Sequence, residues 1–161
     1  GLGDVYKRQV LAFPQADIQS NVFMRLPYGF RVTHPGRYLL KLVKNVYGLK
    51  DAGRTWHEHL RQGLKDRGFT AGLVDPCVFY KDDLILVIYV DDVIAFSPNP
   101  KQITEFVTSM QKEEPQSYVL EDLGDVTSYL GIQVHKTKAG TINLTQPHLI
   151  SKILVSAGFE Q

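Results

Sequence analysis

Cysteine is almost absent from this sequence, and long hydrophobic runs are absent altogether. The single cysteine, Cys77, excludes an internal disulfide and a cysteine-based zinc site. The longest apolar run extends from Leu84 to Val90, far short of the roughly 20 residues that a membrane-spanning helix needs. We therefore expect no membrane partner. Internal repeats are also missing, and 161 residues are enough for one domain with a sizeable core.

The formal net charge of +1 hides an uneven distribution. Residues 25–67 contain ten Lys and Arg against three acids, whereas residues 68–125 contain eleven acids against three lysines. This pattern is typical of a protein that holds a polyanion on one surface and metal ions on another. The simpler interpretation, two solvated surfaces of opposite charge, is favoured by charge alone.

Hydrophobic periodicity predicts helices that alternate irregularly with antiparallel hairpins. Helical spacing is found in residues 54–66, in residues 103–110 after a Ser-Pro-Asn-Pro entry at 97–100, and from Pro147 to Gly158. Strand patterns pair residues 77–80 with 84–89, and residues 128–135 with 141–145, and residues 93–96 form a further short apolar run. The sequence therefore predicts an α+β fold rather than a parallel sheet.

Two adjacent carboxylates, Asp91 and Asp92, separate two very apolar strands, which predicts a rigidly held turn. Neighbouring carboxylates repel each other unless a cation lies beside them, and Mg²⁺ prefers carboxylate oxygens. Two such ions about 3.5–4 Å apart can hold the attacking and the leaving oxygen of a phosphoryl transfer. Aspartate is also a common turn residue, so the pair alone does not distinguish a metal site from an ordinary turn. The Asp82-Asp83 pair, in a plain polar turn, is assigned no chemistry.

The context of the pair resembles the reverse transcriptases of copia-type retrotransposons. Tyr89-Val90-Asp91-Asp92 resembles their catalytic turn, and residues 41–56, with Tyr47-Gly48-Leu49-Lys50 and Arg54-Thr55-Trp56, resemble their Leu-Tyr-Gly-Leu-Lys signature. Further similar blocks follow in the family's order: residues 75–80, 122–124, 129–132 and 144–158. The resemblance covers about residues 10–159, and the ordered set is far more specific than any one block.

This resemblance implies a right-hand polymerase fold, with a palm, partial fingers and the start of the thumb. Residues 10–161 would form a fragment of the reverse transcriptase domain. Within it, residues 10–55 would supply a palm strand and partial fingers, 56–135 the palm, and 136–161 the primer-grip hairpin and first thumb helix. Residues 1–9 fit no family pattern, and we expect them to be a non-native or degenerate leader.

The resemblance also assigns roles to individual residues. Asp91 and Asp92 would be catalytic and would bind two Mg²⁺ ions, with Mn²⁺ as an alternative. Phe13 would lie beneath the sugar as a steric gate on a strand, or belong to the core. Trp56 is expected in the core, and a metal site at His57 and His59 is rejected because residues two apart on a helix point apart. The remaining expected contacts to substrate or primer are Tyr89, Val90, Lys50, Arg54 and the primer-grip residues Leu130, Gly131 and Ile132.

One departure from the family pattern affects the metal site. The family's first catalytic Asp lies four residues before an Ala-Phe pair, which here is Ala12-Phe13, so that Asp is expected at position 8. Arg8 stands there. The stretch 1–9 is then either foreign sequence joined to a real fragment or part of a degenerate copy. Asp51 and Gly53 also replace the family's usual Gln and Pro, which weakens the case for nucleotide contacts from Lys50 and Arg54.

Three functions follow from these observations. The leading one is an RNA-directed DNA polymerase that adds deoxynucleotides to a primer on an RNA or DNA template, with this fragment inactive alone. The second is a non-catalytic nucleic-acid-binding relic, and the third is a structural subunit. By resemblance, the other partners would be parts of the parent polyprotein, and the location would be cytoplasmic, in retrotransposon particles.

Overall fold

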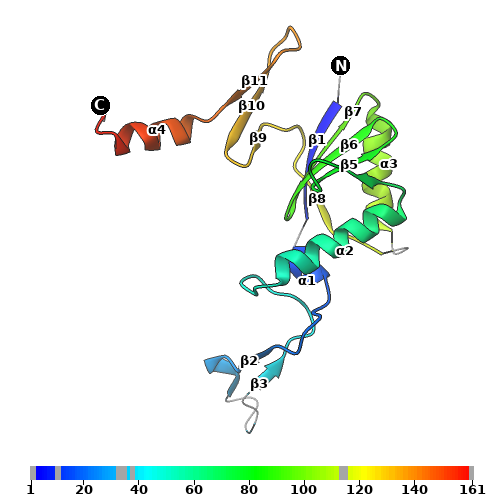
Figure 1. The fold of residues 1–161 in the computed structure, drawn as a ribbon, viewed down its shortest axis with the longest axis vertical. Helices are drawn as coiled ribbons and strands as arrows, with labels where there is room; N and C mark the ends of the chain where they lie inside the picture. The colour runs from blue at the N-terminus through cyan, green and yellow to red at the C-terminus, as the bar shows by residue number, and fades with distance from the viewer. Residues whose placement is uncertain (1–2, 10–11, 32–35, 37–38, 113–115, 160–161) are drawn as a thin grey trace.

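An antiparallel six-stranded sheet forms the centre of the computed structural model, which describes residues 3–9, 12–31, 36, 39–112 and 116–159 (Figure 1). The strand order is β4-β5-β6-β7-β1-β8. The strands are β1 (Gly3–Gln9), β4 (Thr70–Ala71), β5 (Val78–Lys81), β6 (Leu84–Tyr89), β7 (Asp92–Ser97) and β8 (Leu120–Asp122). Strand β1, which the sequence does not predict, is paired on both sides, with β7 and β8.

Two long helices, α2 (Ala52–Asp66) and α3 (Pro100–Gln111), pack into one hydrophobic core with the sheet. Their buried side chains join alternate residues of β6 in this core, which includes Trp56, Leu60, Leu64, Ile103, Phe106, Met110, Leu84, Leu86 and Ile88. Because side chains alternate along a strand, the other residues of β6 lie on the opposite face. That face is more open, and the side chain of Tyr89 on it is 54% exposed.

Two smaller sheets and the last helix lie outside this core (Figure 1). A small sheet pairs β2 (Phe23–Arg25) with β3 (Leu39–Lys41), and a 3-10 helix, η1 (Tyr28–Arg31), follows β2. A three-stranded sheet pairs β10 (Ile132–Lys136) with β9 (Ser128–Tyr129) and β11 (Ile142–Thr145). Helix α4 (Pro147–Ser156) comes last and buries none of its residues.

The predicted α+β class is confirmed, and so are most predicted elements. Helix α3 begins at Pro100, and the side chain of Asn99 accepts a hydrogen bond from the Lys101 backbone N–H at 3.1 Å, which caps the first turn. Helix α4 begins at Pro147 and is followed by Gly158 with φ 77°, a conformation that glycine adopts without a steric penalty. No described helix is long and apolar enough to cross a bilayer.

The expected strand around Phe13 is wrong. Phe13 lies in a short helix, α1 (Ala12–Gln15), and its carbonyl accepts a hydrogen bond from the Ala16 N–H at 3.1 Å. Ala12 and Ala16, four residues apart, are both buried in the core with side chains of α2. A spacing of four residues indicates a helix, whereas the family pattern led to the expectation of a strand. Val10, where the family-like sequence was expected to begin, lies outside the described residues.

Candidate active site

The Asp91-Asp92 pair lies at a tight hairpin turn between β6 and β7, as predicted. Tyr89 pairs directly with Asp92, so that only Val90 and Asp91 form the loop and Asp92 begins β7. Both aspartates are half-buried. The strands on either side are anchored in the hydrophobic core through Ile88 and Val93, so the loop is held from both ends.

Strand register places Asp92 on the open face of the sheet. Residues directly opposite each other in an antiparallel pair project to the same face. Asp92 therefore shares a face with its partner Tyr89, and this is the face away from α2 and α3. A carboxylate on this face is accessible to a ligand that lies across the sheet.

The neighbouring strand β1 brings position 8 next to this site. Arg8 is the register partner of Asp92, and on the other side of β1 it pairs with Glu121. Position 8 is thus in register with the first residue of β7, next to the turn. The family pattern expects Asp at this position, and the chain has Arg.

The described residues do not provide a complete site for two metal ions. The two aspartates have the right chemistry for Mg²⁺, but each ion needs several oxygen ligands. In the part of the chain that the structure describes, no group of three His, Cys, Asp or Glu is close enough to hold a metal. Burial lowers the pKa of the His59 side chain on α2.

The first residue of the loop, Val90, has a strained backbone. Its φ is 55°, in the left-handed region that β-branched residues rarely occupy. The carbonyl of Val90 accepts a hydrogen bond of 2.6 Å from the Nε1–H of Trp56. Trp56 is 1% exposed, which confirms its predicted place in the core. Its contact with the turn was not predicted, because no sequence spacing relates residue 56 to residue 90.

Lys50 lies just before α2 and Arg54 in its first turn, and both are exposed. The guanidinium of Arg54 is 3.7 Å from the carboxylate of Asp51, a surface ion pair that contributes little to stability. Asp51 occupies the N-cap position but makes no side-chain capping bond. Asp51, which stands where the family usually has Gln, thus partly offsets the basic charge of this turn.

Phe13 packs against the edge of the core rather than standing free. Its ring centroid lies 4.5 Å from that of Tyr47, with the planes tilted by 49°. Phe13 is half-buried, while Tyr47 is 53% exposed. The structure thus gives Phe13 a packing role, and its role as a steric gate stays a prediction.

Leu130 and Gly131 form the two-residue turn between β9 and β10. Their φ values are 49° and 81°, and Ile132 pairs with Tyr129 across the turn. These strands belong to the three-stranded sheet, separate from the sheet of the aspartates. Leu130 is 50% exposed, so this turn presents an apolar side chain to solvent.

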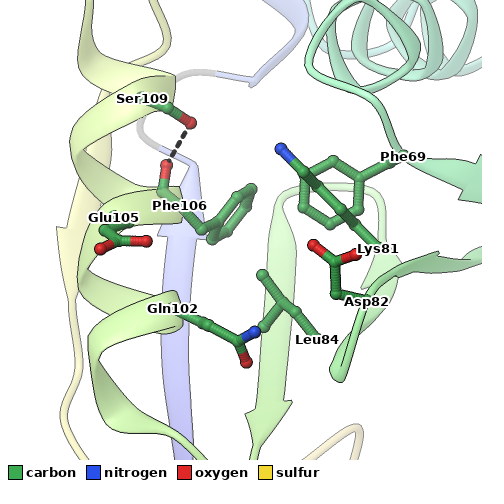
Figure 2. A pocket seen from close by; sticks show the side chains of 8 residues that line it. All are labelled: Phe69, Lys81, Asp82, Leu84, Gln102, Glu105, Phe106 and Ser109. Carbon is green, nitrogen blue, oxygen red and sulfur yellow. Dashed lines mark hydrogen bonds between the residues drawn. The ribbon is translucent and has the colours of Figure 1, made fainter.

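A pocket of about 320 Å³ lies between α3 and the β5–β6 turn, as Figure 2 shows. It is at the opposite end of β6 from Asp91, about 17 Å away along the strand at ~3.3 Å per residue. Lys81, which lines it, donates a hydrogen bond of 2.7 Å to the Arg67 carbonyl and lies 5.6 Å from the centre of the Phe69 ring. Its charged amine is therefore already engaged, and the pocket is not part of the carboxylate site.

Comparisons with known proteins identify the family of this chain. A family model described as reverse transcriptase (RNA-dependent DNA polymerase) matches residues 7–161. The chain is 28% identical over 145 residues to a putative transposon Ty5-1 protein of Saccharomyces cerevisiae, which covers 88% of this chain and 46% of that protein. It is 28% identical over 149 residues to the retrovirus-related Pol polyprotein from transposon TNT 1-94 of Nicotiana tabacum, and 29% identical over 147 residues to that from transposon RE1 of Arabidopsis thaliana.

These relatives are longer than the chain. The alignments cover 89% of this chain in both plant cases, but only 11% and 10% of the two polyproteins. The chain therefore spans less than half the length of the curated relatives described here. No solved structure is significantly similar to the chain.

Proposed function

Because the chain belongs to the reverse transcriptase (RNA-dependent DNA polymerase) family, we propose that its two-residue turn is part of a polymerase active site. Asp91 and Asp92 are two of the metal-binding carboxylates of a copia-type RNA-directed DNA polymerase. The observation that carries this proposal is the register of β6, β7 and β1. It pairs Asp92 with Tyr89 on one side and with position 8 on the other.

The elements have assignable places in a right-hand polymerase. The six-stranded sheet with α2 and α3 is the palm, and β2 and β3 belong to the fingers. The turn at Leu130-Gly131 and the start of β10 at Ile132 are the primer grip, and α4 is the first helix of the thumb. The projection of the smaller sheets and α4 away from the central sheet supports this division (Figure 1).

The chemistry needs two divalent cations, Mg²⁺ or Mn²⁺, which supply the charge that an in-line phosphoryl transfer requires. The protein's own contribution is to hold carboxylates rigidly on one face and to position primer and nucleotide. The ligand set is complete only with Asp at position 8. Arg at that position puts a positive charge beside the turn, so this chain alone is inactive.

Further contacts to substrate come from residues around the turn. Tyr89 and Val90, both partly exposed, line the primer terminus. The exposed cations Lys50 and Arg54 contact template or nucleotide phosphate, with Asp51 limiting their effect. Phe13 lies beneath the sugar of the incoming deoxynucleoside triphosphate. The template is RNA or DNA, and the other partners are parts of a Pol polyprotein in cytoplasmic retrotransposon particles.

A second function has one observation in its favour. Arg8 in register with Asp92 is what a copy that has lost catalysis, but still binds nucleic acid, would contain. Such a relic would bind through the basic segment 25–67, several of whose cations are exposed: Arg25, Lys41, Lys44, Lys50, Arg54, Arg61 and Lys65. Binding of this kind weakens steeply as salt rises, because it depends on phosphate contacts.

Primer extension tests the leading function. A complete reverse transcriptase is assembled around residues 10–161 with Asp at position 8, and is given an RNA template, a DNA primer and Mg²⁺. We expect Asp91→Asn and Asp92→Asn each to abolish extension while nucleic-acid binding is retained. Normal extension by either variant would contradict the proposed metal site. An Asp83→Asn variant, altered in the exposed turn between β5 and β6, is the control for loss of a surface carboxylate.

A further inference from the structure

The two hairpin loops that flank β6 have similar backbone geometry but differ in sequence. In the β5–β6 loop the first residue is Asp82, with φ 51°, and in the β6–β7 loop it is Val90, with φ 55°. Aspartate tolerates this left-handed conformation because its short polar side chain can bond locally, whereas a β-branched residue is disfavoured there. Strained residues persist only where the surrounding structure fixes them. Val90 therefore needs an external restraint that Asp82 does not.

The hydrogen bond from Trp56 is such a restraint. It joins the indole Nε1–H to the Val90 carbonyl at 2.6 Å, and the carbonyl belongs to the peptide that links Val90 to Asp91. Rotation of this peptide changes ψ of Val90 and φ of Asp91 together, which is how one type of two-residue turn converts into another. With the carbonyl directed at α2, the Asp91 N–H is directed to the opposite side. The bond thus fixes the backbone from which the Asp91 carboxylate projects.

Packing gives this loop limited support. A cavity of about 170 Å³ borders it, and is lined by Trp56, Leu60, Cys77 and Val90 among others. The indole itself is held firmly: Trp56 is buried, and its ring meets that of Tyr118 edge-on at 6.1 Å. The donor on α2 therefore adds a restraint at the tip of the loop, beside a cavity, whereas the core holds the loop only at its two ends.

We propose that Trp56 is a positioning residue for the active site, acting through its indole N–H on the Val90–Asp91 peptide. This rests on the proposed function of the turn but concerns a residue outside the carboxylate set. The competing account is that a buried indole has simply found a carbonyl partner. The two accounts differ in what removal of the N–H does to the loop.

The first test uses this chain with Trp56→Phe, which keeps an aromatic ring and removes the donor. Tyr118→Phe is the matched control, because it removes one donor from an equally buried ring whose hydroxyl bonds the His59 carbonyl at 3.0 Å, away from the turn. We expect hydrogen exchange of the Asp91 amide to accelerate about fivefold or more in Trp56→Phe, the equivalent of one hydrogen bond. Tyr118→Phe should leave that amide unchanged. Equal exchange at Asp91 in both variants and the parent chain would overturn the proposal.

A variant that keeps the shape of the indole guards against misfolding. If Trp56→Phe does not fold, Trp56 is replaced by its benzothiophene analogue, in which sulfur takes the place of the N–H. Accelerated exchange at Asp91 in this protein supports the proposal. Unchanged exchange rejects it.

The second test separates this inference from the proposed function. In the complete enzyme with Asp at position 8, we expect Trp56→Phe to lower kcat about tenfold with little change in the KM for primer and template, as misplacement of a reacting group does. If Asp91→Asn is inactive but Trp56→Phe behaves like Tyr118→Phe, Trp56 has no positioning role. If Asp91→Asn is fully active, the proposed function fails, whatever Trp56 does.

Discussion

At the scale of single residues, Arg67 ties the end of α2 to two distant segments. Its guanidinium donates hydrogen bonds to the carbonyls of Ser109 at 3.0 and 3.1 Å, Gln116 at 2.5 Å and Gly63 at 2.9 Å. It also lies 5.6 Å from the centre of the Tyr118 ring. Burial lowers the pKa of Arg67, but a guanidinium remains charged at every pH at which the protein is folded.

Arg67→Lys should therefore destabilise the fold. A single ammonium cannot reach three carbonyls in different directions, so about two of the three carbonyls lose their donor, at roughly 1 kcal/mol each. We expect the free energy of unfolding in urea to fall by about 2 kcal/mol. Arg61→Lys, at an exposed position of the same helix, is the control and should change it by less than about 0.5 kcal/mol. Equal effects of the two substitutions would show that the bonds to Ser109 and Gln116 contribute little.

Phe13 offers a second prediction at this scale. In the complete enzyme, Phe13→Val should increase incorporation of ribonucleotides relative to deoxynucleotides, because a smaller side chain leaves room for a 2′-hydroxyl. Phe13→Tyr keeps the ring and should preserve the discrimination. The measurement is kcat/KM for both nucleotide types. If Phe13→Val loses stability without losing discrimination, the contact between Phe13 and Tyr47 is its whole role.

At the scale of elements, sequence periodicity predicted those helices and strands that bury side chains in the core. Helices α2 and α3 and the strands β5 to β7 bury regular sets of side chains, such as Trp56, Leu60 and Leu64, and their patterns are visible in the sequence. Strand β1 was missed because pairing on both sides with β7 and β8 creates it, and such pairing depends on tertiary structure. Helix α1 was missed because only two buried alanines mark it.

Helix α4 should be the least protected long helix of this chain. It buries no residue, and Ile150, Ile153 and Val155 are each more than half exposed. A helix of ten residues without packing is marginal in water. We expect its amides to exchange with solvent within seconds at neutral pH, whereas those of α3, anchored by Ile103 and Phe106, exchange with the global unfolding of the core. Comparable protection of the two helices would mean that α4 is packed in solution.

At the scale of the whole molecule, the candidate site is an outcome of strand register. The sequence shows the Tyr89-Val90-Asp91-Asp92 pattern, and the family resemblance indicates where a third carboxylate belongs. The sequence does not show that position 8 is the partner of Asp92, because this depends on β1 entering the sheet beside β7. The hydrogen bond from Trp56 to the loop cannot be predicted from the sequence either, since it arises from the packing of α2 against the sheet.

The identity of the residue at position 8 therefore tests the central claim most directly. Two complete enzymes that differ only by Asp or Arg at this position are compared in primer extension on an RNA template with Mg²⁺, with equal folding checked by circular dichroism. A third carboxylate beside Asp92 completes the ligands that two cations need, and a cation there opposes their binding. We expect extension with Asp, and at least about a thousandfold less with Arg, because bound metal ions contribute several kcal/mol of transition-state stabilisation. Equal extension by the two enzymes would contradict the metal site that the register of β1, β6 and β7 supports.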